Sequence, residues 1–119
     1  MKLFNFTGHN VDLVKDAVCT DGIHYSEGKV YMTIPSDGTI LSSSTVAGEK
    51  EDVDGIAIYE APKVELKNPE ILPDSGNVIV PAFLVGLVKD AKPGLTVYTV
   101  GPMSFDGRER LGAIGLIKN

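Results

Sequence analysis

The sequence contains a single cysteine, Cys19, among its 119 residues. One cysteine cannot form an internal disulfide, and it cannot supply the several thiolates of a structural zinc site. We interpret Cys19 as a small, partly buried apolar residue, because free cysteines are usually buried. A nucleophilic role would require one of only two histidines as its base. A lone cysteine also fits a reducing, cytoplasmic compartment.

Long apolar runs are missing as well. The longest apolar segment, residues 78–88, contains Pro81 and Gly86 and is too short for the ~20 apolar residues of a membrane-spanning helix. The apolar stretch at the N-terminus is broken at Asn5 and Thr7, so it lacks the roughly 7–15 residue core of a signal peptide. We therefore expect a cytoplasmic protein with no membrane partner.

Arginine is scarce, and positive charge is in deficit. Acidic residues outnumber basic ones by 16 to 11, which gives a formal net charge of −5. Only two of the 11 basic residues are arginines, Arg108 and Arg110. Binding to a nucleic-acid polymer needs a surplus of Lys and Arg against the phosphates, so we predict no such partner.

The composition that remains is that of one globular domain spanning residues 1–119, with 43% hydrophobic and 23% charged residues. Short runs rich in Val, Ile and Thr, separated by Gly and Pro, favour many short strands. We predict an α+β fold, mainly antiparallel, with seven or eight short strands. One principal helix, about residues 81–92, packs on one face of the sheet.

Alternating apolar residues predict one particular hairpin. Val30, Met32 and Ile34 alternate with polar neighbours from Lys29 onward, which is typical of a half-buried strand. Turn residues follow, so we predict that residues 39–47 form its hairpin partner. The next segment, residues 48–55, is highly charged and is predicted to be a solvated loop.

A strand–helix–strand unit is the clearest pattern in the chain. Residues 77–80 form an apolar run, Pro81 suits the first position of a helix, and residues 82–92 show helical spacing of apolar side chains. Residues 96–100 then alternate as a second strand. By contrast, residues 11–19 fit either a strand or a short helix near residue 14.

Three polar residues near the N-terminus form the first candidate site. Asn5, Thr7 and His9 are spaced so that an extended strand would project all three from one face, while Phe4 and Phe6 enter the core. An amide, a hydroxyl and an imidazole in a row suit recognition of a small polar molecule. The alternative is a set of hydrogen bonds that hold the end of a strand and its turn.

The second candidate site is the glycine-containing segment 101–110, which carries both arginines. Arg108 and Arg110 are suited to gripping a carboxylate or phosphate, and Ser104 adds a hydroxyl. The alternative is an exposed turn in which the arginines pair with Asp106, Glu109 or the acidic segment 48–55.

A third candidate site is the helix start at Val80-Pro81-Ala82, whose free N–H groups can receive an anion, although no phosphate-loop glycine pattern precedes it.

Catalytic and metal-binding patterns are weak. The acidic segment 48–55 does not have the spacing of a calcium loop, and nothing in the spacing of His9 and His24 indicates a metal site. There is no Gly-x-Ser-x-Gly motif. We predict no metal, no cofactor and no catalytic residue, so a binding protein is favoured over an enzyme.

Several short motifs follow one another in a recognisable order. The chain opens with Asn5-Phe6-Thr7-Gly8-His9, continues with Asp54-Gly55-Ile56-Ala57-Ile58 and with residues 79–85, and ends with Gly101-Pro102 and residues 106–112. In these motifs it resembles a family of small phage and bacterial proteins, without an activity we can name, whose opening strand reads like Asn-Leu-Thr-Pro-His. Here Gly8 replaces the proline, and residues 15–28 look like an insertion. The resemblance implies a phage or prophage setting, with the host cytoplasm as the compartment.

These features lead to three functional hypotheses. The first is a homo-oligomeric, non-enzymatic protein that sequesters a small polar or phosphorylated ligand, plausibly nucleotide-derived, with Phe83 at a subunit contact. Its predicted ligand-binding residues are Asn5, Thr7, His9, Tyr59, Tyr98, Ser104, Arg108 and Arg110, the two tyrosines stacking on a base. The second hypothesis is a structural or assembly accessory protein of a phage particle. The third is a small hydrolase or transferase that uses His9.

Overall fold

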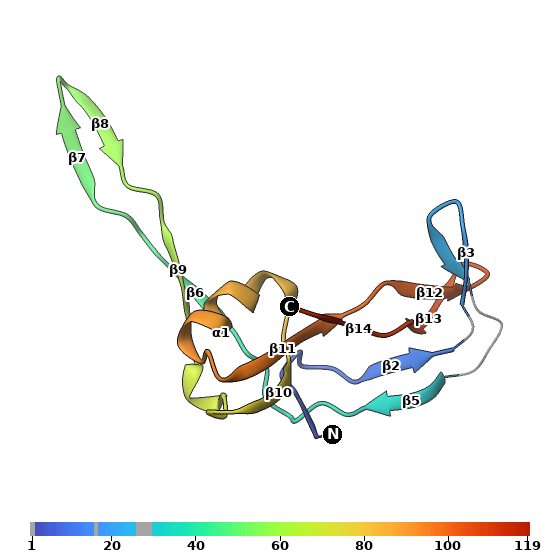
Figure 1. Cartoon of the computed structure of the whole chain (residues 1–119). Coiled ribbons are helices and arrows are strands. Elements are labelled where there is room, and N and C mark those ends of the chain that lie inside the picture. The colour runs from blue at the N-terminus through green and yellow to red at the C-terminus, as the bar shows by residue number, and fades with distance from the viewer. Residues whose placement is uncertain (1, 16, 26–29) are drawn as a thin grey trace.

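The chain is elongated rather than spherical. We describe residues 2–15, 17–25 and 30–119 in a computed structural model with extents of 62 × 36 × 21 Å (Figure 1). Its Cα radius of gyration is 18.7 Å, whereas a compact chain of this length has about 13–14 Å. Two sheets form the body, and a long two-stranded ribbon projects from it.

A four-stranded sheet carries the helix. Its strand order is β1-β10-β11-β14, where β1 is Leu3–Asn5, β10 is Gly76–Ile79, β11 is Leu95–Val100 and β14 is Leu116–Lys118. The first three strands are parallel, and β14 is antiparallel to β11. The predicted strand–helix–strand unit is therefore present, with β10 and β11 as parallel neighbours.

The helical segment connects β10 to β11. A 3-10 turn, η2 (Ala82–Leu84), follows Pro81 and leads into the α-helix α1 (Val85–Ala91). Leu84 and Val88 are fully buried and pack with Val78, Val80 and Val97 of the two strands. Burial of this apolar face fixes the helix on the sheet, because seven residues are too few for a stable isolated helix.

A six-stranded sheet forms the second half of the body. Its order is β3-β4-β12-β13-β2-β5, from β3 (Val18–Thr20), β4 (Ile23–Tyr25), β12 (Met103–Asp106), β13 (Glu109–Ala113), β2 (Val11–Val14) and β5 (Val30–Ile34). A second core cluster lies here, formed by Val11, Leu13, Ile34, Ile79 and Ala113. Ile79 of β10 belongs to this cluster while its neighbours Val78 and Val80 belong to the first, so β10 is buried on both faces.

The projecting ribbon, which we call the arm, comprises residues 43–66. β6 (Ser43–Val46) pairs with β9 (Lys63–Leu66), and β7 (Lys50–Val53) pairs with β8 (Ile56–Tyr59). A short 3-10 helix, η1 (Pro69–Ile71), follows the arm. Figure 1 shows the arm extending away from both sheets, with β7 and β8 at its tip.

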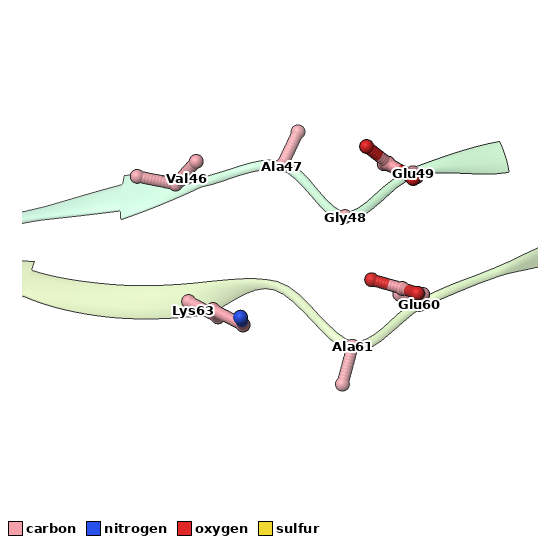
Figure 2. Close-up of a pocket in the computed structure, with 7 residues that line it drawn as sticks. All are labelled: Val46, Ala47, Gly48, Glu49, Glu60, Ala61 and Lys63. Atoms are coloured by element: carbon pink, nitrogen blue, oxygen red, sulfur yellow. The ribbon is translucent and has the colours of Figure 1, made fainter.

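The arm has a joint between its two strand pairs. Figure 2 shows Ala47 and Gly48 running beside Ala61, around a small cavity of about 170 Å³. The N–H of Glu60 donates to the carbonyl of Glu49 at 3.0 Å, so the ribbon continues through the joint. Proline has no N–H to donate, and Pro62 therefore interrupts the ladder at this position.

The predicted fold class is correct only in outline. The described residues contain 14 strands and one short α-helix, and the sheets are mixed, with four parallel pairings. The prediction of seven or eight mainly antiparallel strands was therefore wrong. The count was too low partly because segment 48–55, predicted as a loop, contains the strand β7, and partly because residues 101–118 hold three strands.

Several local predictions also need correction. In segment 11–19, the described residues form β2 (Val11–Val14) and the start of β3 at Val18, and they contain no helix. β5 is a strand as predicted, but only Ile34 in it is buried, and Lys29 lies outside the described residues. β6 pairs with β9 instead of β5. Cys19 is exposed rather than partly buried.

Candidate functional site

The carboxyl ends of the three parallel strands surround a hollow of about 270 Å³. It is lined by the segment after β1, the segment after β10 and the end of β11, namely Thr7, His9, Val80, Pro81, Ala82, Thr99 and Val100. Ligands in sheets with parallel strands commonly bind at the carboxyl ends of those strands. The hollow is therefore the candidate site that the topology itself builds.

Asn5 shapes the loop that lines this hollow. Its side chain is 0% exposed. Its Nδ2 donates to the carbonyls of His9 (3.0 Å) and Ile34 (3.1 Å), and its Oδ1 accepts from the backbone N–H (3.1 Å) and the Oγ1 hydroxyl (2.6 Å) of Thr7. These four contacts use the hydrogen-bonding capacity of the amide. Asn5 therefore positions the loop and has no group left for a ligand.

Gly8 turns the chain so that His9 lies at the rim. Gly8 has φ +85°, and a Cβ at this position would lie 2.9 Å from Cδ1 of Ile40. Proline, with φ fixed near −65°, cannot adopt this conformation. The glycine that departs from the Asn-Leu-Thr-Pro-His-like motif is thus required by the turn seen here.

Three polar groups face the hollow with different capacities. The imidazole of His9 is exposed and makes no hydrogen bond within the described part of the chain. Thr7 is buried, and its hydroxyl donates either to Asn5 or to the carbonyl of His9 at 3.0 Å, which leaves it an acceptor. Thr99 is buried and accepts from Nδ2 of Asn119 at 3.3 Å, which leaves its hydroxyl hydrogen for another partner.

The other predicted ligand-binding residues lie elsewhere in the molecule. Tyr98 packs against the second core cluster and is half-buried. Tyr59 is 67% exposed on the arm, whereas Arg108 and Arg110 are exposed on the hairpin between β12 and β13, at the opposite end of the molecule (Figure 1). The structure does not bring the arginines and Tyr59 to the hollow within one chain.

Ser104 is buried in the six-stranded sheet. It is 0% exposed, and its hydroxyl is the one buried side-chain oxygen without a hydrogen-bond partner in the described residues. It lies opposite Gly112 of β13 and His24 of β4. A buried strand position does not give a ligand access to this hydroxyl.

Thr99 and Val100 line the hollow although the sequence-based reasoning did not assign them to a site, whereas residues 80–82 were predicted only as a helix start that could receive an anion. The signal that could have found them is the strand–helix–strand pattern. Once its two strands are taken as parallel, their carboxyl ends must lie at the same edge of the sheet.

The electrostatics of the described residues are simple. The hydrogen bond and positive charge of Lys92 lower the pKa of Asp74, and the two groups are 2.7 Å apart. Asp74 precedes β10, at the edge of the sheet opposite the hollow. No carboxylate within the described residues bonds His9, so the orientation that a general base requires is not provided.

Neither a metal centre nor a spanning helix is evident in the part of the chain described. Among those residues, no three His, Cys, Asp or Glu side chains are grouped so that they could hold a metal ion. In the same residues, no helix has the length and apolar character needed to cross a membrane.

Comparison with known proteins gives no match: no family model, no curated protein and no solved structure matches this chain. The resemblance to small phage and bacterial proteins therefore stays a prediction.

Proposed function

We propose that this protein is a non-enzymatic binder of a small ligand, which it holds in the hollow at the carboxyl ends of β1, β10 and β11. The observation that carries the proposal is the combination lining that hollow. Val80, Pro81, Ala82 and Val100 supply an apolar wall, and Thr7, His9 and Thr99 supply hydrogen-bonding groups at its edge. An apolar wall with a few fixed polar groups is the usual composition of a small-molecule site.

The size of the hollow limits the ligand. A volume of about 270 Å³ is just below the ~300–1,000 Å³ of typical ligand sites. We therefore propose a compact molecule with one planar ring system, such as a nucleobase or nucleoside, whose ring lies against Pro81 and whose polar edge meets His9 and Thr99. Among the described residues, no Lys or Arg lines the hollow, so any phosphate of a nucleotide-derived ligand would extend away from it.

Binding can be tested with a panel of nucleobases, nucleosides and nucleotides. We expect at least one nucleoside-sized compound to raise the melting temperature, and His9→Ala to weaken its affinity by about 1–2 kcal/mol, roughly 5- to 30-fold. His24→Ala is the matched control, because His24 is the other histidine and lies on β4 of the other sheet. Absence of any thermal shift, together with no small molecule released from the denatured protein, would contradict the proposal.

A phage setting is proposed from the resemblance in sequence alone. In that setting, sequestration of a nucleotide-derived signal would follow from tight binding without turnover. Mass spectrometry of the ligand released from protein produced in infected cells would identify such a signal. Recovery of a chemically altered ligand would instead indicate catalysis.

A second candidate function is favoured by the arm. A structural or assembly accessory protein of a particle needs a projecting element for contacts between subunits, and residues 43–66 form such an element. On this hypothesis the protein should co-purify with particles. Its absence from purified particles would remove this candidate.

A further inference from the structure

The arm exposes a large apolar surface to water. Its large apolar side chains are 39–67% exposed, and they are Val46, Val53, Ile56, Ile58, Tyr59 and Val64. Together they leave on the order of several hundred Å² of apolar surface in contact with solvent, the size of patch that marks an interaction surface. A two-stranded ribbon alone is also at best marginally stable.

Three of the four large apolar side chains of the arm tip lie on one face, which they share with Glu51, whereas Tyr59 lies on the other face. Val53 lies directly opposite Ile56, and Glu51 lies directly opposite Ile58. Because residues opposite each other in an antiparallel pair share a face, and because faces alternate along a strand, Val53, Ile56 and Ile58 are on the same face. This stripe is the part of the arm best suited to packing against another surface.

A second apolar surface lies at the other end of the molecule. It is formed by exposed residues of the neighbouring strands β3 and β4, which are Val18, Ile23 and Tyr25. β3 is an edge strand of the six-stranded sheet, so its outer backbone groups are unpaired within that sheet. We call β3 and β4 the end face.

The two apolar surfaces cannot meet within one chain. The arm tip and the end face lie at opposite ends of a molecule whose longest extent is 62 Å (Figure 1). Two copies arranged antiparallel about a twofold axis would place each arm beside the end face of the other copy. In this closed arrangement the arm and the end face of both copies are covered. A stable dimer buries roughly 800 Å² of surface on each partner.

The charge distribution favours arm against body over arm against arm. Residues 43–66 contain six acidic and two basic residues, a net charge of −4, whereas the whole chain carries −5. Two such arms would repel each other. Arg108 and Arg110 lie on the hairpin at the end-face side and form no ion pair in the described residues, although Asp106 and Glu109 are on the same hairpin.

We infer that the arm is a dimerisation element that docks on the end face of a second copy of this chain. The acidic side chains of each arm then lie near Arg108 and Arg110 of the other copy. The inference is independent of the ligand proposed for the hollow, which is lined by none of these residues.

Sedimentation velocity and light scattering of the full chain test this inference. We expect a dimer, and we expect Ile58→Glu to weaken the dimer Kd about tenfold or more by placing a charge in the apolar stripe. The matched control is Thr39→Glu, which adds the same charge at an exposed position outside both surfaces. A monomeric wild type, or an Ile58→Glu protein as dimeric as the control, would overturn the inference.

A charge exchange keeps the test independent of folding defects. Arg108→Glu with Arg110→Glu should weaken the dimer, and adding Glu51→Lys with Asp52→Lys should restore it. Failure of the second pair to restore the dimer would place the arginines outside the contact and overturn the docking geometry. Open-ended polymers instead of dimers would overturn the twofold arrangement.

Discussion

Asn5 shows how one buried amide determines the geometry of the hollow. It ties the backbone of the loop after β1 to the end of β5 through Ile34, so that β1, the loop and the second sheet are held together. The polar row of Asn5, Thr7 and His9 was predicted as a ligand-contacting face, but β1 ends at Asn5 and the chain turns. Strand spacing alone could not reveal that the amide would bond the residues two and four positions later.

Replacement of Asn5 should therefore destabilise the whole fold. Asn5→Ala leaves the Ile34 carbonyl and the Thr7 N–H without their partners, and we expect a loss of about 2–4 kcal/mol of unfolding free energy. Asn10→Ala is the matched control, since Asn10 is exposed and accepts one hydrogen bond from the N–H of Ser36. Urea denaturation measures both. Equal effects of the two substitutions would contradict the role assigned to Asn5.

Alanine substitutions at Gly8 and Gly38 distinguish the cost of backbone strain from the cost of a steric contact. Both have positive φ, +85° and +80°, but only a Cβ at Gly8 meets a neighbour, namely Ile40. Gly38→Ala should cost about 1 kcal/mol for the backbone conformation alone. Gly8→Ala should cost more and should also weaken ligand binding by displacing His9. If thermal unfolding shows the same loss for both, the contact with Ile40 does not restrict the loop.

At the scale of elements, the apolar pattern of the sequence predicted secondary structure where that pattern lies within one continuous segment. Helical spacing after Pro81 and the apolar runs 77–80 and 96–100 gave β10, α1 and β11 approximately. Pairing between distant segments was not predictable from pattern alone. β6 satisfies the same alternation whether it pairs with β5 or with β9, and the actual partner, β9, lies beyond the arm tip. The charged composition of residues 48–55 did not indicate the strand β7, because an exposed ribbon needs no buried face.

The joint of the arm depends on the absence of a side chain at Gly48. A Cβ at this position would lie 2.1 Å from the backbone oxygen of Glu60, closer than any side chain tolerates. Gly48→Ala should therefore separate the two chain segments at the joint while leaving both core clusters intact. Hydrogen exchange should show faster exchange of the Glu60 amide and of β7 and β8. Gly86→Ala in α1 is the control, because nothing lies within 4 Å of its Cβ position and its φ is not positive.

The end of α1 is connected to the loop before β10 by one ion pair. Lys92 lowers the pKa of Asp74, so the ionised carboxylate is favoured in the folded state. Stability from this pair is present above the unfolded-state pKa of Asp74 and is lost as the pH falls through the lower folded-state value. Lys92→Gln should therefore reduce the dependence of the unfolding free energy on pH in acid. The effect should be small because Asp74 is exposed to solvent. If the substitution leaves the unfolding free energy at acid pH unchanged, the ion pair contributes nothing to stability.

For the whole molecule, the shape separates the proposed ligand site from the two proposed dimer contacts. The hollow belongs to the sheet that carries α1, whereas the arm and the end face lie at the two extremities (Figure 1). Composition correctly indicated a chain rich in strands, but it could not indicate that a fifth of the chain would project from the two sheets. The residues predicted as one site are distributed between hollow, arm and hairpin. Proximity between them in a dimer depends on the arrangement of two copies, which no local pattern encodes.

Titration of the ¹⁵N-labelled protein with the nucleoside panel, followed by two-dimensional NMR, tests the central claim most directly. The account predicts that a bound compound shifts the amide signals of residues 7–9, 82 and 99–100 around the hollow, and that His9→Ala moves these shifts to higher compound concentrations. Shifts confined to the hairpin of Arg108 and Arg110, or no shifts with any compound, would contradict it.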